Sequence, residues 1–193
     1  MATGKICAAT GNEEKLRRLR KALRGSGIRV YQRPLDLPEL RSDNVVCVAA
    51  HKVLFAFERL REPCVVLDSG FFIRALNDFP KTSVKLAIST IGPKGILTLV
   101  EGRNRLCEFR HCLAYFDGAQ MRFFTSTSPG TIASQLQGKK SSWALHRIFI
   151  PKGECTAIAA MKRGQRLAWE RRRDQSYYIT KFARWMVRRA KAP

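Results

Sequence analysis

Residues 6–24 read ICAATGNEEKLRRLRKALR, and this stretch contains the first strand and the first helix that we expect. Its apolar run ends at Thr10, Gly11 and Asn12, and a charged segment with leucines at helical spacing begins at once. A strand that ends in a glycine-containing turn at a helix start presents backbone N–H groups to an anion. Asn12 is a good N-cap for this helix. Lys15 stands in the first helical turn, where the helix dipole disfavours a cation. The pattern indicates a phosphate ligand, the alternative being an ordinary strand–helix turn with a solvated lysine.

The remaining chain first alternates strand and helix patterns and then predicts a hairpin. We expect strands at 5–9, 28–31 and 64–67, and helices after Asn12, over 45–60 and over 82–91. The strand pattern at 106–116 is followed by Asp117-Gly118 and returns at 121–126, which predicts the hairpin. Pro129-Gly130 and Gly138 indicate loops, and an amphipathic helix is expected from Asp174 onward. This order of elements predicts a mixed α/β fold.

Length and composition favour a packed globule over a disordered chain. The chain has 193 residues, 45% of them hydrophobic, which suffices for one substantial domain or for two lobes sharing a core. Its apolar runs are too short to span a bilayer, and its first residues lack the apolar segment of a secretory signal. Six cysteines without a CxxC pair indicate free thiols in a reducing, intracellular compartment. We expect the cytoplasm, with the nucleus or an organelle left open.

The strongest feature of the composition is the charge. Thirty-six Lys and Arg residues against fifteen Asp and Glu residues give a formal net charge of +21. An enzyme acting on a small neutral molecule does not need such an excess. The charge therefore predicts a polyanionic partner, which is RNA, DNA, an anionic surface or a phosphorylated ligand.

Two carboxylates stand out as candidates for metal binding. Asp68 follows the buried run 64–67 and is expected at the carboxyl edge of the sheet, where open α/β sheets bind ligands. Glu39 lies on a loop that contains Pro34 and Pro38. Mg²⁺ prefers one or two carboxylates together with substrate phosphates. The alternatives are an aspartate that caps a turn and an exposed loop glutamate.

The order of these motifs resembles the inosine triphosphate pyrophosphatase family. The matching segments are TGNEEK at 10–15, DLPE at 36–39, VVLDSG at 65–70, FFTSTSPGTIAS at 123–134 and IFIPKGECTAIAAM at 148–161. The resemblance covers residues 5–173. Members cleave non-canonical purine triphosphates such as ITP and XTP to the monophosphate and pyrophosphate with Mg²⁺, Mn²⁺ being the alternative metal. The family fold is a long mixed twisted sheet flanked by helices, with two lobes around a nucleotide cleft, and its members commonly form homodimers.

The resemblance also implies roles for individual residues. Asp68, Glu39 and Lys15 would form the catalytic centre, and Glu39 and Asp68 would bind the metal. A metal-activated water would attack the α-phosphorus, with pyrophosphate as the leaving group. The implied phosphate-binding residues are Thr10, Gly11, Asn12, Lys15, Lys52, Ser69, Lys85 and Arg172. The implied base pocket contains Trp143, His146 and Arg171.

Several positions depart from the family pattern. The family has an acidic residue just before the key aspartate, and this chain has Leu67. The Asp of the family's base-binding aromatic-Asp-Pro motif corresponds to His146, and the family's Ser-His-Arg corresponds to Glu170-Arg171-Arg172. The family's Gly-Gly-x-Pro-Gly segment is reduced to Pro80 and its neighbours. These changes predict a relaxed or altered base preference and a weaker metal site.

Two functional hypotheses follow. The first is a divergent nucleoside triphosphate diphosphatase with retained catalysis. The second is an impaired pseudoenzyme that binds RNA or DNA through its basic surface, chiefly Lys181, Arg184, Arg188 and Lys191 with interleaved aromatic residues. The alternatives for this segment are a helix docked on the core with a solvated basic face, or a membrane-surface helix.

Of these two hypotheses we predict the first, a divergent nucleoside triphosphate diphosphatase with retained catalysis. We assign residues 1–173 to a pyrophosphatase-like α/β domain and residues 174–193 to a basic amphipathic helix that packs on this domain or extends from it.

Overall fold

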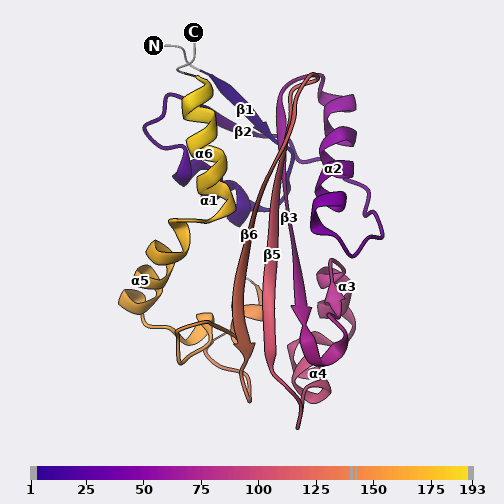
Figure 1. The fold of residues 1–193 in the computed structure, drawn as a ribbon, viewed down its shortest axis with the longest axis vertical. Coiled ribbons are helices and arrows are strands. Elements are labelled where there is room, and N and C mark those ends of the chain that lie inside the picture. The colour runs from indigo at the N-terminus through magenta and orange to yellow at the C-terminus, as the bar shows by residue number, and fades with distance from the viewer. Residues whose placement is uncertain (1–3, 140, 142, 191–193) are drawn as a thin grey trace. The chain divides into compact units, whose positions relative to one another are not determined.

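The computed structural model describes residues 4–139, 141 and 143–190 (Figure 1). The strands are β1 (Lys5–Ala8), β2 (Arg29–Gln32), β3 (Cys64–Ile73), β4 (Pro80–Lys81), β5 (Leu106–Phe116), β6 (Met121–Ile132) and β7 (Phe149–Pro151). The helices are α1 (Glu13–Ala22), α2 (Val45–Leu60), α3 (Val84–Thr90), α4 (Gly92–Leu99), α5 (Arg163–Asp174) and α6 (Tyr178–Arg189). Short 3-10 turns occur at Arg74–Leu76, Ala144–Arg147 and Ile158–Ala160.

The strands form one mixed sheet, as the sequence predicts. Its hydrogen-bonded order is β2-β1-β3-β5-β6-β7, and β4 pairs with β3 beside this path. β1 pairs in parallel with both β2 and β3, whereas β3–β4 and β6–β7 are antiparallel pairs. Strand β1 is central to the parallel part, so the turn that follows it opens at a carboxyl edge of the sheet.

The chain divides into two compact units. Unit 1 comprises residues 1–68, 111–126 and 174–193, and unit 2 comprises residues 69–110 and 127–173. Strands β3, β5 and β6 each contribute residues to both units. The terminal segment from Asp174, which we expected to pack on or extend from the preceding domain, belongs to unit 1 together with the N-terminal residues.

The core of unit 1 joins the two ends of the chain. Leu16 and Leu19 on the apolar face of α1 are buried in one cluster with Ile179 and Phe182 on the apolar face of α6. The spacing of these residues places each pair on one side of its helix. α6 therefore docks on the core, as the docked-helix alternative predicts. Lys191 lies outside the described residues.

The aromatic residues near α6 belong to this core. Tyr177 and Tyr178 are only 4% and 2% exposed, and Trp185 packs against Tyr115 and Phe124. The expectation that these rings lie interleaved with exposed basic residues and stack on nucleic-acid bases is therefore wrong. Their hydrophobic area stabilises unit 1.

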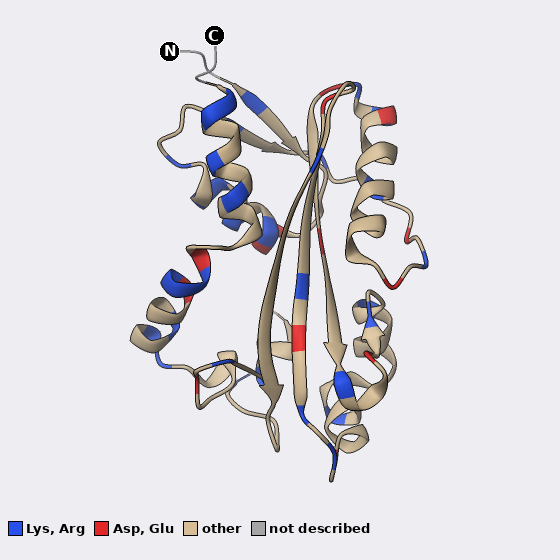
Figure 2. Ribbon diagram, viewed as in Figure 1, with Lys and Arg blue, Asp and Glu red and all other residues tan. Residues whose placement is uncertain are grey.

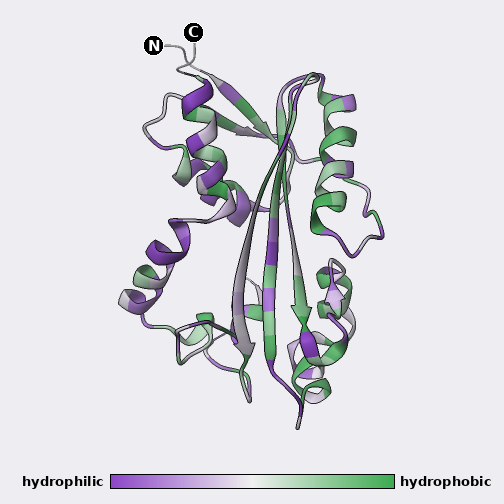
Figure 3. Ribbon diagram, viewed as in Figure 1, coloured by the Kyte–Doolittle hydropathy of each residue, from purple (hydrophilic) through white to green (hydrophobic). Residues whose placement is uncertain are grey.

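Unit 2 has its own aromatic core. The ring of Phe109 lies 4.5 Å from that of Phe71 and 4.7 Å from that of Phe149, measured between centroids. Helix α4 contributes Ile96, and Leu145 comes from a 3-10 turn. Figure 3 shows the predominance of hydrophobic residues in α2, which lies in unit 1, and of hydrophilic residues in α5, which lies in unit 2.

Several boundaries differ from the predicted ones. β3 continues through Asp68 to Ile73, because the buried side chains of Phe71 and Phe72 extend the strand beyond the predicted end at residue 67. Pro129-Gly130 lies inside β6, since Gly130 pairs with Pro151 of β7 in a spot with no room for a Cβ. Helices α4 and α5 were not predicted, because Pro93 fits the first turn of a helix and α5 lacks a clear apolar stripe.

Four of the six cysteines are buried, and all six are free thiols. Burial raises the pKa of Cys7 to about 11, with a further contribution from Glu62, and it raises the pKa of Cys64 to about 12. These thiols are therefore protonated at neutral pH and serve as small core residues. In the part of the chain that the structure describes, no helix is long and apolar enough to cross a membrane.

The turn between β5 and β6 is attached to α6 through Asp117. Its carboxylate accepts hydrogen bonds from the backbone N–H groups of Ala119 and Gln120 and from the guanidinium of Arg189. Burial would raise the pKa of Asp117, but these bonds and one from Tyr115 lower it to about 2. A carboxylate with a lowered pKa stabilises the fold above its ordinary value of 3.8, and this contribution is lost as the pH falls through about 2.

We therefore expect Asp117→Asn to destabilise the protein in a pH-dependent way. The amide retains acceptors for the backbone bonds but loses the ionic bond to Arg189, which costs about 1 kcal/mol or roughly 2–4 °C in Tm at pH 7. The difference from the unchanged protein should shrink between pH 4 and pH 2. Thermal unfolding at several pH values measures it, with the exposed Glu101→Gln as the control. A difference that is independent of pH would contradict this account.

Candidate active site

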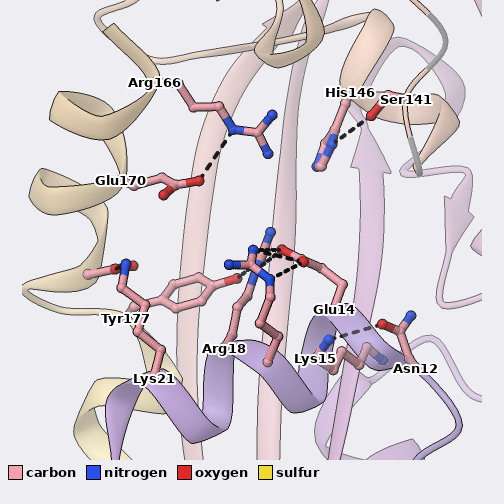
Figure 4. Close-up of polar contacts among 12 residues, drawn as sticks. Asn12, Glu14, Lys15, Arg18, Lys21, Ser141, His146, Arg166, Glu170 and Tyr177 are labelled. Carbon is pink, nitrogen blue, oxygen red and sulfur yellow. Dashed lines mark hydrogen bonds and ion pairs between the residues drawn. The ribbon is translucent and has the colours of Figure 1, made fainter. Parts of the chain in front are cut away.

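The turn after β1 has the predicted helix cap. The side-chain oxygen of Asn12 accepts a hydrogen bond from the backbone N–H of Lys15 at 3.0 Å (Figure 4). Thr10 Oγ1 accepts one from the N–H of Asn12 at 3.1 Å. Gly11 is exposed, and a Cβ added to it would meet open space. The turn is thus ordered by its own side chains and leaves the helix start accessible on the side of Gly11.

Lys15 is directed to strand β3 and does not extend freely into solvent. Its Nζ donates a hydrogen bond of 2.7 Å to the carbonyl oxygen of Leu67, the residue just before Asp68. Burial lowers the pKa of Lys15, and the neighbouring ammonium of Lys52 lowers it further. The carboxylates of Asp68 and Glu39 raise this pKa, but the net shift is downward. The alternative of an ordinary solvated lysine is wrong, because Lys15 is only partly exposed and its ammonium donates to the main chain of β3.

Lys52 joins the two carboxylates that the sequence singled out. It lies on α2 and is 8% exposed. Its Nζ is 2.7 Å from Asp68 Oδ2 and 3.2 Å from Glu39 Oε2. Burial lowers the pKa of Lys52, but Asp68 and Glu39 raise it, and the net shift is upward. Four residues from four segments of unit 1 thus form one cluster of charges, namely Lys15, Glu39, Lys52 and Asp68.

The two carboxylates fit a Mg²⁺ ion that takes its other ligands from elsewhere. Asp68 and Glu39 converge on one cation, the ammonium of Lys52. Among the described residues, no group of three or more His, Cys, Asp or Glu side chains is arranged to hold a metal ion. Mg²⁺ needs only one or two carboxylates when phosphates and water complete its coordination. The cluster is therefore suited to a metal that arrives with a phosphorylated ligand.

The position before Asp68, which is acidic in the family pattern, is occupied in this chain by Leu67, so the site has no carboxylate at that position. The side chain of Leu67 is 3% exposed in the core of unit 1, on the opposite face of β3 from Asp68. The carbonyl oxygen of the same residue accepts the Lys15 hydrogen bond. A main-chain oxygen thus anchors the lysine, and sequence patterns contain no signal for such a contact.

Arg18 is a second feature that sequence analysis missed. Its guanidinium donates to Glu14 Oε1 at 2.8 Å and to the hydroxyl of Tyr177 at 3.3 Å (Figure 4). Arg18 also contributes to the lowered pKa of Lys15. The signal was its position three residues after Lys15 on α1, which places both side chains on neighbouring faces of the helix.

The other predicted phosphate-binding and base-pocket residues lie in unit 2. Arg172 on α5 forms an ion pair with Glu154, while Lys85 on α3 and Arg171 on α5 are exposed. His146 is 6% exposed, and its Nδ1 lies 3.3 Å from Ser141 Oγ. The rings of Trp143 and Phe109 are 4.7 Å apart, and Ser69 is half-buried in β3. His146 and Trp143 also contact each other edge to face, so these two base-pocket candidates are adjacent.

The model of the Ham1 family matches residues 6–176 of the chain. The chain belongs to the Ham1 family. The predicted family resemblance is thereby confirmed, and so is the α/β fold class.

Curated relatives match most of this Ham1 chain. A protein of Methanopyrus kandleri named dITP/XTP pyrophosphatase is 38% identical over 159 residues, which cover 81% of this chain and 84% of that protein. A protein of the same name from Thermococcus kodakarensis is 31% identical over 183 residues, which cover 94% and 97%. The structure of a HAM1 protein from Coxiella burnetii matches with a TM-score of 0.78 at 18% identity, covering 95% of this chain and 96% of that chain. The structural match supports the fold alone.

Lys52→Met tests the charge cluster of this Ham1 chain without reference to substrate. The substitution leaves Asp68, with a side chain only 16% exposed, without its ammonium partner, which should lower the free energy of unfolding by roughly 2 kcal/mol at pH 7. Because the pKa of Lys52 is raised, its contribution is complete below 10.5 and is lost as the pH rises through the higher native value.

Denaturant titration from pH 6 to pH 9 should give a constant difference from the unchanged protein, and the difference should decrease above pH 10.5. The control is Lys94→Met, which removes an exposed lysine of α4 and should change stability by less than about 0.5 kcal/mol. Equal effects of the two substitutions would show that Lys52 has no special partner.

Proposed function

We propose that this Ham1 chain hydrolyses non-canonical purine nucleoside triphosphates to the monophosphate and pyrophosphate. The main support is the cluster in which Lys52 contacts both Asp68 and Glu39 while Lys15 lies within their electrostatic range. This cluster follows a capped helix start suited to an anion. The names of the curated relatives, dITP/XTP pyrophosphatase, support the same activity.

In the proposed mechanism, cationic groups of unit 1 bind the triphosphate. The backbone of Thr10, Gly11 and Asn12 and the ammonium of Lys15 hold phosphate oxygens. Burial without an anion lowers the pKa of Lys15, and the negative charge of a bound triphosphate compensates this cost. The expected role of the lysine is thus to bind the substrate as a cation.

Glu39 and Asp68 are the proposed ligands of Mg²⁺, with Mn²⁺ as the alternative. When bound, the metal supplies a Lewis acid that polarises phosphate and water. A bound cation would match the charge of the two carboxylates, and the ammonium of Lys52, which now pairs with both of them, would then be available to a phosphate oxygen. Asp68 orients the attacking water, and Lys15 and Lys52 stabilise the charge that develops as pyrophosphate leaves.

The other predicted site residues complete the proposal. Lys85, Ser69 and Arg172 are further candidates for phosphate binding, the last after release from Glu154. Trp143, His146 and Arg171 are candidates for base recognition, and a histidine in place of an acid predicts an altered base preference. We also predict a homodimer in a reducing compartment, the cytoplasm.

The pseudoenzyme hypothesis is not favoured. It requires that the catalytic cluster has lost its function, whereas all four charged residues are present and Lys52 contacts both carboxylates. The curated relatives that match over most of the chain are named as enzymes. The basic surface therefore requires an explanation that is compatible with catalysis.

Pyrophosphate release from dITP, XTP, ITP, dUTP and the four ordinary triphosphates with Mg²⁺ tests the proposed activity. Asp68→Asn should lower kcat/KM by about 100-fold or more, because it removes both a metal ligand and the group that orients water. The matched control is Asp78→Asn, which alters a half-exposed aspartate of unit 2 and should leave turnover within about threefold. Absence of turnover on every triphosphate from folded protein would refute the proposal.

The metal site has its own test, which does not depend on turnover. Mg²⁺ should raise the Tm in the presence of pyrophosphate, because a ligand that binds only the folded state stabilises it. Glu39→Gln should shift the midpoint of this titration to at least tenfold higher Mg²⁺, while Glu101→Gln should not change it. An unchanged midpoint in Glu39→Gln would exclude Glu39 as a metal ligand.

A further inference from the structure

Two basic helix faces lie side by side in unit 1, and the candidate active site uses neither. On α1 and the turn after it, Arg17, Arg20, Lys21 and Arg24 recur at helical spacing. On α6, Lys181, Arg184 and Arg188 recur in the same way, and this helix contains no acidic residue. Figure 2 shows the basic residues of both helices, and we call these seven residues the α1–α6 basic surface.

The packing of the two helices places these residues outside the core. The apolar faces of α1 and α6 are buried in one cluster, so the opposite faces are directed to solvent. All seven residues of the surface are exposed. The helices are adjacent, since Arg18 of α1 donates to Tyr177 at the start of α6 and Lys21 lies 3.8 Å from Asp174. The two stripes therefore lie on the solvent-exposed sides of two adjacent helices of unit 1.

Much of the charge on the α1–α6 basic surface is not neutralised by the protein. Arg17 pairs with Glu14, Lys21 lies near Asp174, and Lys181 donates to the carbonyl oxygen of Thr125. Within residues 4–139, 141 and 143–190, no ion pair to an acid is found for the remaining arginines, which are Arg20, Arg24, Arg184 and Arg188. Exposed arginines on two adjacent helices repel one another unless an anion binds there.

We propose that the α1–α6 basic surface binds the phosphate backbone of a nucleic-acid duplex. Two adjacent cationic stripes complement a duplex, which has one negative charge per about 1.7 Å of its axis. The net charge of +21 favours such a partner over long range. The activity proposed above is compatible with this surface, which would hold the enzyme close to nucleic acid without taking part in catalysis.

The structure favours a duplex backbone over other anionic partners. Single-stranded nucleic acid is bound largely by stacking on exposed aromatic rings, but Tyr177 and Tyr178 are buried and Trp185 packs on the core. A membrane-surface helix inserts an apolar face, and here Ile179 and Phe182 are occupied by the core of unit 1. A second copy of the same surface is disfavoured, because like charges would meet. Binding should therefore be independent of sequence and strongly dependent on salt.

Fluorescence anisotropy with a labelled duplex of about 20 base pairs tests the proposal. The variant combines Arg20→Gln, Arg24→Gln, Arg184→Gln and Arg188→Gln in the full chain. Each lost phosphate contact removes about 0.9 from the slope of log affinity against log salt, so the slope should fall by about 3–4. Affinity at 0.1 M salt should fall by roughly 100-fold or more, while pyrophosphate release remains unchanged.

The matched control removes the same number of charges from unit 2 by Lys94→Gln, Arg103→Gln, Lys152→Gln and Lys162→Gln, all of which are exposed. It should retain the salt slope to within about 1. Equal losses in the two variants would show that only total charge acts and would overturn the proposal. Circular dichroism verifies that each variant is folded. If the quadruple variant is unstable, the double variant Arg184→Gln/Arg188→Gln replaces it, and the slope should then fall by about 2.

Two further arms separate the duplex from other partners. The same oligonucleotide as a single strand should bind more weakly and with a smaller salt slope, because its charge density is lower. Vesicles containing phosphatidylserine should bind more weakly than the duplex. Preferential binding to the single strand or to the vesicles, or no duplex binding at 0.1 M salt, would overturn the proposal.

Discussion

The candidate active site depends on one buried lysine that two carboxylates share. Lys52 Nζ contacts Asp68 at 2.7 Å and Glu39 at 3.2 Å, and it comes from a helix whose other buried residues are all apolar. A buried ammonium is unfavourable unless it is paired, and here the pairing raises its pKa. The lysine pairs with an exposed loop glutamate and with a largely buried strand aspartate. It thereby assembles two potential metal ligands that would otherwise repel each other.

Strand β3 provides the other constraint. Its alternating side chains bury Leu67 and direct Asp68 to the opposite face, while the carbonyl oxygen of Leu67 holds Lys15. A single dipeptide therefore supplies a core residue, an anchor for one lysine and a carboxylate for another. The burial of Lys15 lowers its pKa, because the charged ammonium is less favourable there than in water. A bound anion would offset this effect.

The basic residues of the protein occur in two different environments. Lys15 and Lys52 lie among carboxylates in the candidate site, where burial makes each of them sensitive to its neighbours. The arginines of the α1–α6 basic surface are exposed on a solvent face, where they act together over a longer range. The same terminal helix that carries part of this surface buries Phe182 in the core, so its basic face is kept outward by packing.

The sequence by itself determined the family, the α/β class, the bounds of α2 and β5, and the Asn12 cap, because these depend on local spacing and motif order. It also identified Lys15, Glu39, Lys52 and Asp68 one by one. Only the tertiary structure decided that Lys52 lies between the two carboxylates, that β3 continues past Asp68, and that the aromatic residues near α6 are buried. These outcomes depend on contacts between residues far apart in the chain, and local patterns carry no information about such contacts.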